Sequence, residues 1–188
     1  LHDALPILPD RGLHLIFPAI FRKGKNQDLI IKAFAHFIVR SKDQNSSLFL
    51  PGDGPLLDEM KSLAKTLGIA DRVYFPGYCT RNTLCELERL CNVAVIPTNV
   101  ETYGLCIVEP FVLGKCILTR KVGIAEDIIK EEVNGFYFNN SDDLEELFMK
   151  LSKDITLVNS IGFTNFKLKK KFNWAYIVEK YYIPIYKS

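Results

Sequence analysis

Residues 13–39 read LHLIFPAIFRKGKNQDLIIKAFAHFIV and contain the first strand and the first helix that the sequence predicts. The run Leu13–Phe17 is short and apolar, which predicts a buried strand. After a turn, apolar residues over Asn26–Val39 recur at the spacing of one helical face, which predicts an amphipathic helix. A strand that leads directly into a helix is the repeating unit of parallel α/β sheets.

The same alternation continues along the chain. Further strands are expected at Leu48–Leu50, Val73–Phe75, Val93–Ile96, Cys116–Leu118 and Phe136–Phe138. Helices are expected at Leu56–Leu67, Asn82–Leu90 and Leu105–Leu113, and the chain should be mostly helical after an N-cap at Ser141. The pattern predicts an α/β fold: a Rossmann-like, doubly wound parallel sheet with helices on both faces and a helical C-terminal tail.

Length and composition fit one globular domain with a real core, because 48% of the 188 residues are hydrophobic. We expect this domain over residues 11–188. Residues 1–10 form a poorly defined segment that need not be native, and a preceding domain is expected outside the sequence. The aromatic end, Phe172–Tyr186, should pack on this domain or on a neighbour.

Charge and cysteine usage exclude several classes of protein. The net charge is only +2, and the longest basic block is Lys169–Lys171, so no nucleic-acid partner is expected. The five cysteines are an odd number without a C-x-x-C pair, which favours small buried side chains in a reducing compartment. Without a membrane-spanning run or a signal peptide, the sequence predicts a cytoplasmic protein.

Three loops at the carboxyl ends of the expected strands carry chemistry, which is where ligands bind in open parallel sheets. The first, Arg22-Lys23-Gly24-Lys25, combines cations with a glycine at a helix start and suits a phosphate, although a basic surface turn explains it equally well. The second, Gly52 to Pro55, is interpreted as a structural turn rather than a ligand loop. Neither G-x-x-x-x-G-K-S/T nor G-x-G-x-x-G occurs, which argues against an oxidoreductase cofactor domain.

The third loop carries two carboxylates eight positions apart, Glu101 and Glu109, on either side of Gly104. Glu109 lies in the apolar run LCIVEPFVL, so it should be partly buried and in need of donors such as the two hydroxyls of a ribose. The N–H groups of Gly104 and Leu105 would meet a phosphate at the helix start. The structural alternative stays open: Glu109 pairs with a basic residue and Glu101 caps the helix.

In these motifs the chain resembles the C-terminal, donor-binding domain of GT-B-fold glycosyltransferases, specifically the retaining family 4, or glycosyl transferases group 1. The resemblance runs from Leu13 to Tyr186, and its most specific element is the E-x7-E motif of Glu101 and Glu109. Supporting motifs follow in order: Lys23-Gly24, Gly52 to Pro55, Asp71-Arg72-Val73, Phe75-Pro76-Gly77, Val122 to Glu126 and Phe172-Asn173-Trp174. The family builds bacterial surface polysaccharides and lipid-linked sugars.

The resemblance implies roles for individual residues. Lys23 would neutralise the donor diphosphate and Glu101 would contact the transferred sugar, so these two are the expected catalytic residues. Glu109 would hold the ribose hydroxyls. The other donor-binding residues that it implies are Arg22, Gly24, Tyr78, Tyr103, Gly104 and Leu105, with Tyr78 near the base. It implies a nucleotide-diphosphate sugar as donor substrate, with no cofactor and no metal.

The sequence departs from the family at the end of the first strand. An Arg is usual there a few residues before the Lys, whereas residues 17–21 read FPAIF, and Arg22 is the candidate replacement. The resemblance also implies an acceptor-binding N-terminal domain that this sequence lacks, and it is compatible with peripheral membrane association of the whole protein. Two alternatives use the same ligand without transfer: an epimerase-like GT-B protein and a regulatory nucleotide-binding module.

Overall fold

A computed structural model describes residues 8–173 of the chain. Its centre is a six-stranded parallel sheet with the strand order β3-β2-β1-β4-β5-β6. The strands are β1 (His14–Ile16), β2 (Ser47–Phe49), β3 (Val73–Tyr74), β4 (Val93–Ile96), β5 (Cys116–Thr119) and β6 (Gly135–Tyr137). The predicted parallel sheet is confirmed, and each strand lies within one or two residues of its expected position.

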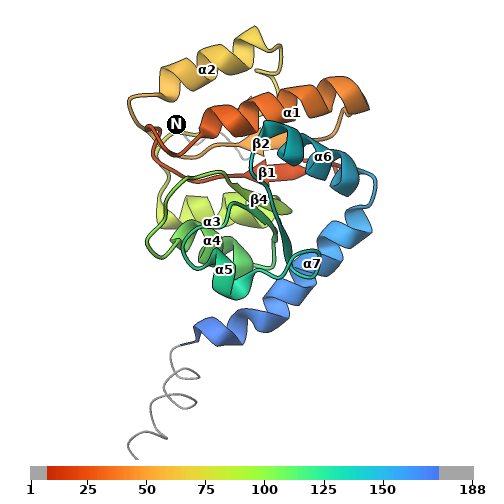
Figure 1. Ribbon diagram of the computed structural model, residues 1–188. Helices are drawn as coiled ribbons and strands as arrows, with labels where there is room; N and C mark the ends of the chain where they lie inside the picture. Colours follow the sequence, from red (N-terminus) through yellow and green to blue (C-terminus); the bar gives the residue numbers. More distant parts are fainter. Residues whose placement is uncertain (1–7, 174–188) are drawn as a thin grey trace, which may run out of the picture.

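Helices cover both faces of the sheet, as predicted (Figure 1). They are α1 (Gln27–Ser41), α2 (Leu57–Thr66), α3 (Arg81–Leu90), α4 (Leu105–Val112), α5 (Ala125–Ile128), α6 (Ser141–Ser152) and α7 (Ile155–Leu168). The short 3-10 helix η1 (Lys169–Phe172) follows. Figure 1 shows α1, α2 and α6 on one face and α3, α4 and α5 on the other, while α7 contacts both α4 and β5.

The core forms because apolar residues face inward from the sheet and from the helices that cover it. All residues of β1, β2, β4 and β5 are buried, as expected for central strands that have helices on both faces. On one face, Phe37 of α1 meets Phe148 of α6 edge to face, with ring centroids 5.9 Å apart. This contact joins the first and the sixth helix on the same face of the sheet.

Differences from the sequence prediction lie mainly in the last third of the chain. The N-cap of α6 is Asn140 rather than Ser141, because the Asn140 side chain accepts from the N–H groups of the first turn. A break at Asp154, the N-cap of α7, divides the expected helical region in two. The four-residue helix α5 is too short for a hydrophobic period to predict it.

The predictions for the two ends are tested only in part. Phe172 packs on Phe111 of α4 with ring centroids 5.4 Å apart, so the start of the aromatic end contacts its own domain. The rest of that end, 174–188, and residues 1–7 lie outside the described residues. Over residues 8–173, no helix is both long and apolar enough to span a bilayer.

The cysteine side chains agree with the predicted role as small apolar residues. All five are free thiols, with Cys91 and Cys116 buried and the other three partly buried. Burial raises the pKa of Cys116 to about 12, so this thiol stays neutral at any physiological pH.

Candidate functional site

The site lies at the carboxyl edge of the sheet, between the two central strands. Strand order reverses between β1 and β4, and in open parallel sheets the crevice at such a point is where ligands bind. A cavity of about 530 Å³ opens there, lined by the loop after β1 and by the segment that leads from β4 into α4. We call it the edge cavity; residues 18–20, Arg22, Lys25 and 101–106 contribute to its wall.

An ion pair between Lys25 and Glu101 stands in the wall of the edge cavity. The Lys25 Nζ contacts Glu101 Oε1, and each side chain is only 15% exposed, so solvent screens the pair less than a surface pair. The Cys106 thiol lies 3.7 Å from the same carboxylate oxygen. Burial, followed by the charge of Glu101, raises the pKa of Cys106 to about 12, so the thiol remains a neutral donor.

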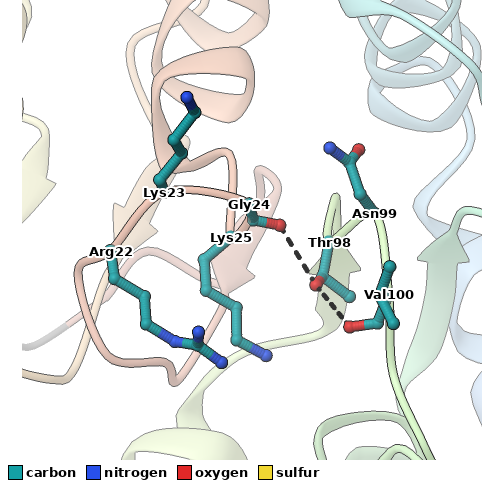
Figure 2. A pocket seen from close by; sticks show the side chains of 7 residues that line it. All are labelled: Arg22, Lys23, Gly24, Lys25, Thr98, Asn99 and Val100. Carbon is teal, nitrogen blue, oxygen red and sulfur yellow. Dashed lines mark hydrogen bonds between the residues drawn. The ribbon is translucent and has the colours of Figure 1, made fainter.

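Of the two lysines in this loop, Lys25 lines the edge cavity and the predicted Lys23 does not. Gly24, with φ at 89°, turns the backbone between the two lysines. Figure 2 shows the side chains of Arg22 and Lys25 extending to one side of the loop and that of Lys23 to the other. Both Arg22 and Lys23 are exposed, but only Arg22 lines the edge cavity. Lys23 lines the neighbouring pocket of about 200 Å³ that Figure 2 shows, which residues 22–25 and 98–100 form. No helical or strand period runs through this loop, so nothing in the sequence ranks one lysine above the other.

The backbone of Gly24 ties the loop after β1 to the loop after β4. Its carbonyl accepts from the Thr98 hydroxyl at 3.3 Å, drawn in Figure 2, and from the Asn99 N–H at 3.1 Å. Asn26 donates through its side chain to the Pro97 carbonyl and to Asn99, both at 2.8 Å. These bonds hold the basic loop, residues 22–25, in place beside the start of α4.

Helix α4 begins at the edge cavity. Gly104 is its N-cap with φ at 96°, and the following Leu105 is 60% exposed. Because the first N–H groups of a helix lack partners within it, this end can bind an anion. The loop 122–126 supports it, since the Ile124 N–H donates to the Tyr103 carbonyl at 2.9 Å. Tyr103 itself is half exposed at the rim.

The second carboxylate of the motif faces a different cavity. Glu109 lies one turn into α4 and is 35% exposed, which confirms the predicted partial burial. It lies 3.9 Å from Arg81 of α3, so the alternative of a basic partner is realised for this residue. For Glu101 the alternative of a helix cap is wrong, because α4 has no side-chain cap and Glu101 pairs with Lys25.

Two predicted elements do not line the edge cavity. Tyr78 follows β3 and is 86% exposed. The turn at Gly52 to Pro55 is structural, as interpreted: a Cβ on Gly52 would lie 2.1 Å from the Ala19 carbonyl oxygen, so this glycine lets two loops pack backbone to backbone. In the part of the chain that the structure describes, no group of three or more His, Cys, Asp or Glu side chains could hold a metal ion.

Comparison with known proteins shows the family to which the chain belongs. The family model for "Glycosyl transferases group 1" matches residues 7–162. A glycosyltransferase of Methanocaldococcus jannaschii is 31% identical over 132 residues, covering 69% of this chain and 33% of its own length. The N-acetyl-alpha-D-glucosaminyl L-malate synthase of Bacillus anthracis is 30% identical over 151 residues, with 79% of this chain and 38% of the relative covered.

Among solved structures, HepE of Anabaena, in complex with UDP and glucose, superposes with a TM-score of 0.78 at 20% identity. The match covers 94% of this chain and 49% of HepE, so the chain has the fold of one half of that protein. The chain likewise spans less than half the length of the two relatives above. The family match extends over most of the sequence, and the chain belongs to the glycosyl transferases group 1.

Proposed function

We propose that this chain binds a nucleotide-diphosphate sugar in the edge cavity and forms the donor half of a glycosyltransferase. The observation that carries the proposal is the convergence of Lys25, Arg22 and the start of α4 on one cavity. Two cations and a helix N-terminus together favour a diphosphate, which carries several negative charges. HepE, which has the same fold, holds UDP and glucose in its crystal structure.

In this proposal Lys25 takes the role expected of Lys23. Breaking the bond between the sugar and the nucleotide leaves negative charge on the phosphate oxygens of the departing nucleoside diphosphate. Fixed donors aimed at that charge are often the largest catalytic contribution. Lys25 lies in the cavity wall, paired with Glu101, and Gly104 and Leu105 at the start of α4 line the same cavity. We therefore assign the stabilisation of this negative charge to these groups, with Arg22 beside them, and propose that no metal is required.

The two carboxylates then serve different parts of the donor. Glu101 lies in the edge cavity next to Lys25, where it would accept from hydroxyls of the transferred sugar. Glu109 lies one turn into α4 and is 35% exposed, which leaves its carboxylate accessible to a ribose diol. The exposed Tyr78 would cover the base from the loop after β3.

The chemistry of the whole enzyme needs more than this chain. An enzyme of this fold that reacts in the cleft between two domains binds its acceptor on the second domain. We propose that this second domain lies outside the present sequence. We further propose that the whole protein is a retaining hexosyltransferase of family 4 that acts in bacterial surface polysaccharide or glycolipid synthesis. The anomeric configuration of a product made by the whole protein would test the retaining mechanism.

The proposal is tested by calorimetric titration of the chain with a panel of nucleotide diphosphates and their sugars. At least one nucleotide sugar should bind, and Glu109→Ala should weaken it by about 10- to 150-fold, the effect of losing hydrogen bonds to a charged acceptor. Glu59→Ala is the matched control, since Glu59 is exposed on α2 and lines neither the edge cavity nor the cavity beside Glu109. Equal binding by Glu109→Ala and Glu59→Ala would refute the assignment of Glu109.

A further inference from the structure

A second cavity lies between α3 and α4. It measures about 170 Å³, and its wall is apolar except for three charged residues: Arg81 and Glu88 from α3, and Glu109 from α4. The apolar part comes from Leu84, Cys85, Val112 and Leu113. We call it the helix cavity. Glu109, the residue that we assign to the ribose, therefore shares this cavity with two other charged side chains.

Glu88 is the unusual member of this group. It is 2% exposed, and within residues 8–173 its Oε1 atom is buried without a hydrogen-bond partner. A buried carboxylate without donors is costly, so the side chain favours its neutral form. Burial first, and then the nearby charge of Glu109, raise the pKa of Glu88 to about 7, against the opposing charges of Lys115 and Arg81.

The charged groups around Glu88 come from three elements. On its own helix Arg81 attracts an ionised Glu88, on α4 Glu109 repels it, and ahead of β5 Lys115 attracts it. The neighbouring Cys91 stays a neutral thiol, because burial raises its pKa. Arg81 can serve either carboxylate: its side chain is 85% exposed and lies 3.9 Å from Glu109.

We propose that Glu88 is a proton-dependent positioning residue for Glu109. When Glu88 is neutral, Arg81 stays with Glu109 and holds that carboxylate for the donor. When Glu88 loses its proton, it repels Glu109 across the helix cavity and competes for Arg81. Donor binding then weakens as the pH rises through neutrality. This inference rests on the proposed function of Glu109.

The test compares donor affinity at pH 6 and pH 8 by calorimetry, for the unmodified chain, Glu88→Gln and Glu86→Gln. The ligand is the nucleotide sugar selected by the panel above, because its diphosphate, esterified at both ends, does not titrate between these values. Glu88→Gln imitates the neutral acid, and Glu86 is an exposed glutamate of the same helix. We expect affinity to fall by about five-fold in the unmodified chain and in Glu86→Gln, a size typical of one like-charge interaction at a partly solvated site. Glu88→Gln should bind equally at both pH values.

A pH dependence that survives in Glu88→Gln, or its absence from an unmodified chain that binds donor, would overturn the inference. A second measurement needs no ligand: carboxyl carbon NMR of glutamate-labelled protein, with the Glu88 and Glu109 signals assigned from their substitution variants. Both signals should shift together near pH 7. If Glu109 does not respond there, the coupling is refuted whether or not a donor binds; if no nucleotide sugar binds while the signals do shift together, the proposed function fails and the coupling stands.

Discussion

The loops after β1 and β2 lie side by side at the carboxyl edge of the sheet, and both contain glycines with positive φ. Gly52, with φ at 142°, has the Ala19 carbonyl oxygen 2.1 Å from where its Cβ would be. Gly24, with φ at 89°, has nothing within 4 Å of that position. The first of these glycines lets two backbones pack together, whereas the second turns the chain beside open space. The comparison shows that a glycine next to a binding edge is informative only once its surroundings are known.

Of the changes that test this comparison, substitution of Gly52 should have the largest effect, a loss of unfolding free energy. Gly52→Ala combines an unfavourable backbone conformation with a clash against backbone, so we expect a loss of about 3 kcal/mol or more in the free energy of unfolding. Gly24→Ala meets no neighbouring atom and should cost about 1 kcal/mol from the backbone alone. Urea denaturation of the two variants measures both values. Equal losses would show that the two loops do not differ as described.

The buried acid Glu88 extends the comparison to the helix cavity and gives an intermediate effect. The pKa of Glu88 is raised from 4.5 to about 7. The contribution of its protonated side chain to the free energy of unfolding is therefore complete below pH 4.5 and is lost as the pH rises through 7. Relative to Glu88→Gln, the unmodified chain should lose about 1–3 kcal/mol of unfolding free energy between pH 4.5 and 7.5. Denaturation at both pH values tests this, and a constant difference between the two proteins would contradict it.

Removal of divalent metal ions should have the smallest effect. In the loop after β1, Arg22 and Lys25 supply positive charge from the chain itself, and we propose that they replace a metal at the diphosphate. Donor affinity measured by calorimetry in excess EDTA should therefore change by less than about two-fold, well under the tenfold that 1.4 kcal/mol represents. Loss of binding in EDTA, with recovery on adding Mg²⁺, would show that the loop alone is insufficient.

The fold could be predicted from the sequence because its determinants are local. The apolar run Leu13–Phe17 and the helical period after it predict β1 and α1 without reference to any other segment. The errors occur where a contact with another residue determines the structure. Asn140 rather than Ser141 caps α6, because the Asn140 side-chain oxygen reaches the first-turn N–H groups. Sequence alone offers two adjacent capping residues and no way to choose between them.

The site was predictable in its place but not in its contacts. The E-x7-E spacing located both carboxylates, yet it could not show that Glu101 meets Lys25 while Glu109 meets Arg81. Those pairings depend on how β1 and α3 lie beside α4. Lys23 and Lys25 differ only by the turn at Gly24, and the burial of Glu88 beside residues of α4 at the helix cavity depends on how distant segments meet.

The central claim, that Lys25 and not Lys23 meets the donor diphosphate, is tested most directly by calorimetry on Lys25→Met and Lys23→Met with the nucleotide sugar that binds best. Thermal unfolding of both variants, and of Lys25→Met with Glu101→Gln, controls for the carboxylate left unpaired by the first change. We predict that Lys25→Met weakens binding by about 10- to 150-fold, the loss of charged hydrogen bonds, and that Lys23→Met changes it by less than about three-fold. Weaker binding by Lys23→Met than by Lys25→Met would contradict the account.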